Sequence, residues 1–75
     1  MDIIRLTLER AIGEGKRVRM NYQTGDSISE RRFKPYELTE DSVTGYCYLR
    51  RAKRSFKLSG ILSAQLIEER NQKNG

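Results

Sequence analysis

The sequence contains no histidine and no tryptophan, and it has only one cysteine and one proline among its 75 residues. Without histidine the chain lacks the commonest metal ligand and the side chain best suited to proton transfer near neutral pH. The single cysteine, Cys47, cannot form an internal disulfide, which is typical of a cytoplasmic protein. Metal centres of the Cys/His type are therefore excluded, and we expect a non-enzymatic protein without a cofactor.

Long hydrophobic stretches are missing as well. The longest uncharged run, residues 58–67, includes two serines and a glutamine, whereas a membrane span needs about 20 apolar residues. No long apolar run follows the N-terminus, which argues against a signal peptide. We therefore expect one small cytoplasmic domain over residues 1–69 and a flexible polar tail over residues 70–75.

Positive charge is abundant and unevenly placed. The 15 Lys and Arg outnumber the 10 Asp and Glu, for a formal net charge of +5. Residues 16–34 carry six basic and two acidic side chains, and residues 46–60 carry five basic side chains and no acid. If strand pairing brings the two blocks together, they form a positive surface for a polyanion. Taken singly, such charges also suit the solvated edges of a sheet.

Hydrophobic periodicity predicts a helix near the N-terminus. Asp2 is a suitable N-cap, and Gly13 and Gly15 are natural stop signals. The apolar stripe of this helix consists of Ile4, Leu8, Ala11 and Ile12.

After Gly15 the hydrophobic period changes to two, which indicates strands. Pro35 is expected to end the second strand, followed by a loop over residues 37–41. A short connection at Arg51-Ala52 joins the third strand to the fourth. The predicted strands span residues 17–23, 28–34, 43–50 and 53–58.

Residues 62–67 fit either a last strand or a short helix, because periodicity does not distinguish the two. The fold class is α+β and mostly β, with one helix before a four- or five-stranded antiparallel sheet. So few residues must curl into a small barrel to protect the strand edges and enclose a core.

An alternation of aromatic and basic side chains is the strongest candidate for chemistry. Tyrosine rings offer π-faces to bases, and arginine offers a fork for phosphate or carboxylate. The same alternation also suits a merely solvated strand face. The predicted ligand-binding residues are Tyr46, Tyr48, Arg50 and, across the expected hairpin, Arg54. A secondary nucleic-acid-binding patch is predicted from Arg17, Arg19, Arg31, Arg32 and Lys57.

Five segments carry a family resemblance. In order they read LERAI, VRMNY, SERRFKPYEL, GYCYLR and RSFKL, and Ile61 follows. Over residues 6–67 they resemble the WYL domain of bacterial transcription regulators, in the variant that reads roughly AYC-x-L-R before R-T-F-R-L-D-R-I. The family's Trp-Tyr-Leu signature is absent, and Gly60 stands where the family has its last pocket arginine.

The resemblance implies an Sm-like or SH3-like bent barrel with a leading helix, and it implies ligand sensing. Tyr46, Arg50 and Arg54 match the family's basic and aromatic site, while Tyr48 occupies a position that varies in the family. The implied partner is single-stranded nucleic acid or a nucleotide effector.

No helix-turn-helix fits beside the barrel in 75 residues, so we expect a stand-alone module that acts through a partner or by oligomerising. The sequence is compatible with two functions. One is a regulatory binding module for an anionic ligand, and the other is an assembly subunit that pairs through strand edges.

Overall fold

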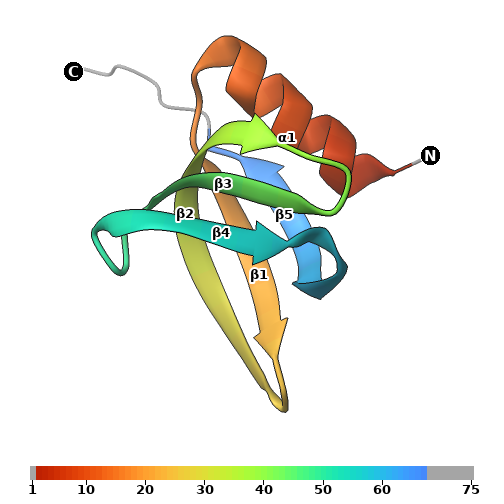
Figure 1. Cartoon of the computed structure of the whole chain (residues 1–75), viewed down its shortest axis with the longest axis vertical. Coiled ribbons are helices and arrows are strands. Elements are labelled where there is room, and N and C mark those ends of the chain that lie inside the picture. Colours follow the sequence, from red (N-terminus) through yellow and green to blue (C-terminus); the bar gives the residue numbers. More distant parts are fainter. Residues whose placement is uncertain (1, 68–75) are drawn as a thin grey trace.

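Residues 2–67 fold as one α-helix followed by five antiparallel strands (Figure 1), which confirms the predicted fold class. This computed structural model describes residues 2–67, so the predicted tail and the expected domain end at residue 69 lie outside the described residues. The elements are α1 (Ile3–Glu14), β1 (Val18–Thr24), β2 (Ser27–Leu38), β3 (Ser42–Cys47), β4 (Ala52–Lys57), the short 3-10 helix η1 (Leu58–Gly60) and β5 (Ile61–Leu66).

Local capping chemistry sets both ends of α1. The Asp2 carboxylate accepts a hydrogen bond from the backbone N–H of Arg5 at 3.1 Å, as an N-cap should. Gly15 adopts a left-handed conformation with φ of 66°, which a glycine tolerates without steric cost. The predicted helix is confirmed, and Gly15 rather than Gly13 is its C-cap.

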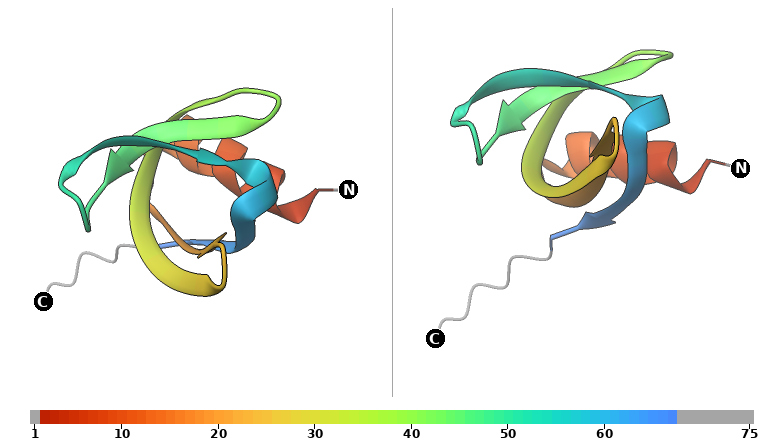
Figure 2. Two further views of the ribbon diagram at one scale, coloured as in Figure 1. Left: turned by 60° about the horizontal axis from the view of Figure 1, so that its bottom comes forward. Right: turned by 90° about the horizontal axis from the view of Figure 1, so that it is seen from below.

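The five strands form one sheet in the order β4-β3-β2-β1-β5. The sheet is strongly bent, and α1 lies across one open end of it (Figure 2). β4 and β5 form the two edges, and η1 connects them. Residues 61–66 are a strand, which decides between the two interpretations of that segment.

The course of β2 corrects two predictions. The strand does not end at Pro35 but continues to Leu38, so the predicted loop over residues 37–41 shrinks to 39–41. The register with β3 shifts between Pro35 and Glu37, and the pairing with β1 has already ended at Phe33. A missing N–H is tolerated at such a bulge, because the ladder is interrupted there.

The β3–β4 hairpin also differs from the prediction. β3 ends at Cys47, which pairs with Ala52, so the connection is a four-residue turn over residues 48–51 and not Arg51-Ala52. Arg51 has φ of 53° and closes this turn without a glycine. Tyr48 and Arg50 therefore belong to a turn, although periodicity placed them in a strand.

The core lies between the concave face of the sheet and α1. At its centre, the Phe56 ring meets the edges of two other rings, Tyr22 at 4.8 Å and Phe33 at 5.2 Å between centroids. We call the sheet face that carries these rings the core face and the opposite one the outer face. The buried residues are Leu8, Ala11, Val18, Met20, Phe33, Val43, Cys47, Phe56 and Ile61.

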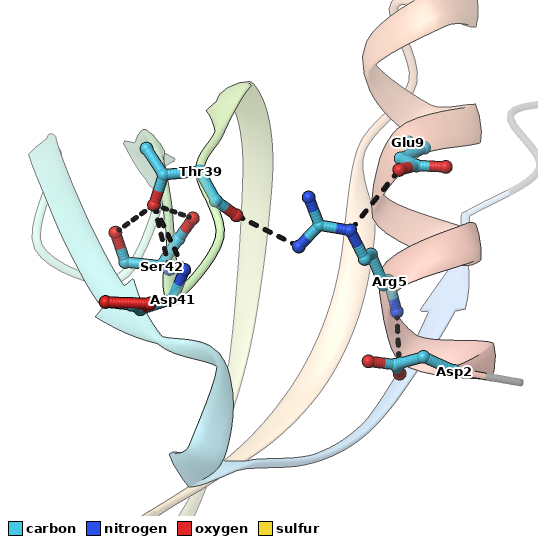
Figure 3. Close-up of polar contacts among 6 residues, drawn as sticks. All are labelled: Asp2, Arg5, Glu9, Thr39, Asp41 and Ser42. Carbon is cyan, nitrogen blue, oxygen red and sulfur yellow. Dashed lines mark hydrogen bonds and ion pairs between the residues drawn. The ribbon is translucent and has the colours of Figure 1, made fainter.

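Polar contacts fasten α1 to the turn between β2 and β3 (Figure 3). Arg5 donates from Nη1 to the carbonyl oxygen of Thr39 at 3.0 Å, and its Nε lies 3.4 Å from a carboxylate oxygen of Glu9. The Thr39 hydroxyl accepts the backbone N–H of Ser42 at 3.0 Å. These exposed contacts orient the turn, and we assign them a structural role.

Candidate functional site

Basic side chains gather on the outer face where β1, β2 and β3 lie side by side. Arg19 of β1 lies opposite Arg32 of β2, and Lys34 of β2 lies opposite Tyr46 of β3. Arg17 directly precedes β1 and has the same parity as Arg19. Alternate residues of a strand share a face, so all five side chains point away from the core.

Tyr48 joins these residues into one surface. Its backbone N–H donates to the carbonyl oxygen of Arg32 at 3.0 Å, which continues the β2–β3 pairing past the end of β3. Its ring meets the Tyr46 ring edge to face at 4.9 Å, and the Arg17 guanidinium carbon lies 5.4 Å from its centroid. We define the basic–aromatic patch as Arg17, Arg19, Arg32, Lys34, Tyr46 and Tyr48.

Two hollows have Tyr48 in their walls. The first has a volume of about 160 Å³ and three cations in its wall; its lining is Gly15, Lys16, Arg17, Lys34, Tyr48 and Ile67. The second has a volume of about 310 Å³ and is lined by Glu30, Arg32, Tyr48 and Leu49. The patch is thus a shaped surface, and Tyr48 belongs to both of its hollows.

Two carboxylates lie near the patch. Glu14 contacts Arg10 at 2.9 Å and Lys16 at 3.2 Å, and these hydrogen bonds hold the pKa of the Glu14 carboxyl below its ordinary value. Glu30 lies 3.9 Å from Arg19, at the outer limit of an ion pair. Basic side chains still outnumber acidic ones here, so the local field favours anions.

Of the four predicted ligand-binding residues, the structure brings Tyr46 and Tyr48 together. Arg50 follows in the same turn and is exposed. Arg54 lies opposite Gly45, whereas Lys53 lies opposite Tyr46. Neighbouring positions on a strand point to opposite faces, so Arg54 is on the core face and the expected juxtaposition of Arg54 with Tyr46 is wrong.

The predicted secondary patch divides in a similar way. Arg17, Arg19 and Arg32 lie in the basic–aromatic patch. Arg31 lies opposite Met20 on the core face, and its Nε donates to the Ser29 hydroxyl at 3.2 Å. Lys57 lies opposite Ser42, whereas Lys53 lies opposite Tyr46 of the patch. Four residues of β4 separate the two lysines, so Lys57 is roughly 13 Å from Lys53.

The contact between Arg17 and Tyr48, which organises the site, was not predicted from the sequence. Arg17 and Tyr48 are far apart in the sequence, and only the placement of β2 between β1 and β3 brings them together. Lys34 and Lys16 belonged to a recognised basic block but were not among the predicted site residues. The sequence offered one signal for this site: Arg17 and Arg19 occupy alternate positions on a predicted strand and therefore share a face.

Gly60 occupies a position that leaves room for a ring. A Cβ atom at this residue would lie 2.8 Å from Cε1 of Tyr22, whose ring packs against Phe56. A larger side chain here therefore requires Tyr22 to move. Gly60 takes the place of the arginine that the family has at this position.

Within residues 2–67, no group of three or more Cys, His, Asp or Glu side chains is placed to hold a metal ion. The only α-helix of this part of the chain, α1, is too short and too polar to cross a membrane.

Comparisons with known proteins agree with this architecture. A search of curated proteins gave no match. Among solved structures, the chain is similar to proteasome accessory factor B/C (PafBC) of Arthrobacter aurescens, with a TM-score of 0.72 and 26% sequence identity. The similarity covers 83% of this chain and 11% of the PafBC chain, so this chain corresponds to a small part of that protein. The WYL domain profile matches residues 4–66, and the chain therefore belongs to the WYL domain family.

Proposed function

We propose that this WYL domain is a non-enzymatic, regulatory binding module whose basic–aromatic patch recognises an anionic ligand, either single-stranded nucleic acid or a nucleotide. The observation that carries the proposal is the Arg17 guanidinium packed over the ring of Tyr48, a residue that lines two hollows. Four cations and two tyrosines share this one face. Such a combination matches the two chemical parts of a nucleotide, its phosphate and its base.

The patch divides the recognition between its members. Arginine and lysine donors suit phosphate oxygens, and a tyrosine ring suits the π-face of an unpaired base. A base within a duplex hides its faces by stacking, so the aromatic part favours single-stranded or free nucleotides. Arg50, two residues after Tyr48, is a proposed contact for a longer strand, whereas Arg54 on the core face contributes only to the overall positive field.

A salt titration tests this proposal. We expect a fluorescently labelled single-stranded oligonucleotide to bind with an affinity that falls about fiftyfold between about 50 and about 200 mM salt, if four phosphates contact Arg17, Arg19, Arg32 and Lys34. The measurement is fluorescence anisotropy at several salt concentrations, with the matching duplex as the comparison. Absence of binding at low salt, or an affinity that does not change with salt, contradicts the proposal.

A second candidate function is assembly through strand edges. β4 and β5 are edge strands with unpaired backbone groups, and such edges pair readily with other chains. Beside β5, Ile3 and Leu62 are 65% and 47% exposed, and they line a groove of about 650 Å³ between the start of α1 and β5. These features favour a contact with another polypeptide.

Light scattering tests the second function. If assembly is the function, the protein has a molar mass of two or more chains that does not depend on salt, and Leu62→Lys restores the monomer. A wild-type monomer at all accessible concentrations contradicts self-assembly. Because Leu62 lies outside the basic–aromatic patch, oligonucleotide binding by the variant keeps the two functions separable.

A further inference from the structure

We infer that the patch holds a nucleotide in one orientation, with its phosphate in the first hollow and its base in the second, and that it prefers guanine. The inference rests on the proposed function and names the ligand class more closely. The two hollows that Tyr48 lines differ in charge. Three cations line the first hollow, whereas the second is lined by one carboxylate and one cation, Glu30 and Arg32, beside the apolar Leu49.

The charge difference orients the ligand. The first hollow, at about 160 Å³, has the volume of about five water molecules, which is enough for a phosphate group. Arg17 and Lys34 in its wall carry hydrogen-bond donors, and neither has acceptor capacity in its side chain. In the second hollow, the Glu30 carboxylate offsets the charge of Arg32, so a phosphate is attracted less strongly there than in the first hollow. The phosphate therefore enters beside Arg17 and Lys34, and the base extends toward Glu30.

The second hollow suits a flat, partly apolar group. Tyr48 and Leu49 supply apolar surface, and Leu49 is 63% exposed, so a base that covers it also removes apolar area from water. At the rim, Glu30 is acceptor-only and Arg32 is donor-only. The hollow thus presents one acceptor group and one donor group to the edges of the base.

Guanine matches this pair of groups. Its N1–H and amino group form two adjacent donors that a single carboxylate accepts, and its O6 and N7 form an acceptor pair that arginine reads with two hydrogen bonds. Adenine turns a ring-nitrogen acceptor toward a carboxylate, and the pyrimidines lack the N7 acceptor. Glu30 contacts Arg19 through Oε2 at 3.9 Å, a weak exposed ion pair that costs little to rearrange.

Calorimetric titrations with GMP, AMP, CMP and UMP test the inference. We expect GMP to bind at least about tenfold more tightly than the other three, because one good bidentate base contact discriminates by about 1–3 kcal/mol. Glu30→Gln is expected to weaken GMP binding to the level of the other three nucleotides and to leave the binding of those three unchanged. Glu40→Gln is the matched control, since it removes the same charge from the exposed turn between β2 and β3.

Guanosine, which has no phosphate, tests the orientation. Lys34→Ala is expected to weaken GMP binding about tenfold and to leave guanosine binding unchanged, whereas Glu30→Gln weakens both. Equal affinity for all four nucleotides overturns the guanine preference and leaves the proposed function standing. Equal weakening of GMP and guanosine by Lys34→Ala overturns the orientation. If no nucleotide and no oligonucleotide binds, the proposed function fails as well.

Discussion

Phe33→Ala is expected to lower the free energy of unfolding by about 3–5 kcal/mol. Phe33 is fully buried in the central strand, lies between Val18 and Cys47 on the neighbouring strands, and packs edge to face on Phe56. Truncation removes the largest fully buried side chain and leaves a cavity at the centre of the core. A chain of this length has a total stability of about 4–11 kcal/mol, so a large part of the domain's stability depends on this one ring.

Urea denaturation followed by circular dichroism measures this effect. Ile28→Ala is the control, because Ile28 is also an apolar β2 residue but is 61% exposed, and we expect a change within about 0.5 kcal/mol. Phe33→Leu retains part of the buried volume, so its loss of unfolding free energy should lie between those of Phe33→Ala and Ile28→Ala. If Phe33→Ala and Ile28→Ala unfold at the same urea concentration, the core described above is wrong.

Tyr48→Ala is expected to weaken oligonucleotide and nucleotide binding about tenfold to a hundredfold, since stacking of a base on an aromatic ring contributes about 1–3 kcal/mol. The same substitution also removes the ring on which the Arg17 guanidinium packs. Tyr48→Phe keeps the ring and should keep most of the affinity. Fluorescence anisotropy at low salt gives the three affinities, and denaturation curves show whether the variants remain folded.

Arg17→Ala separates local recognition from overall charge. We expect it to weaken binding about tenfold, because a hydrogen bond to a charged group contributes about 1.5–3 kcal/mol. Lys57→Ala removes the same charge outside the patch and should change the affinity less than about twofold. Since Arg17 and Tyr48 are in contact, the double variant should lose less than the product of the two single effects. Equal losses for Arg17→Ala and Lys57→Ala contradict a localised site.

Features that depend on local chemistry could be predicted from the sequence. The N-cap at Asp2, the glycine at the end of α1 and the alternation of Val18 and Met20 each reflect a physical rule that acts within a few residues. These rules were sufficient for the helix, for most strands and for the fold class.

Features that depend on neighbouring strands could not be predicted. Pro35 is tolerated within β2 because the pairing with β1 ends before it and the register with β3 shifts beside it. The turn after Cys47 requires a left-handed Arg51, a conformation that residue type alone does not favour. Arg54 lies opposite Gly45 and therefore on the core face, so the error in the candidate site was the assignment of Arg54 to the face of Tyr46.

The position of Tyr48 and Leu49 in a turn bears on how ligand preference can change between related domains. Their side chains contribute to the second hollow, but neither belongs to the strands that enclose the core. Substitutions at these two positions can therefore reshape the contact surface while the ladder and the packed interior stay as they are. Selection on the four-residue connection alone offers a route by which one scaffold acquires a different chemical preference.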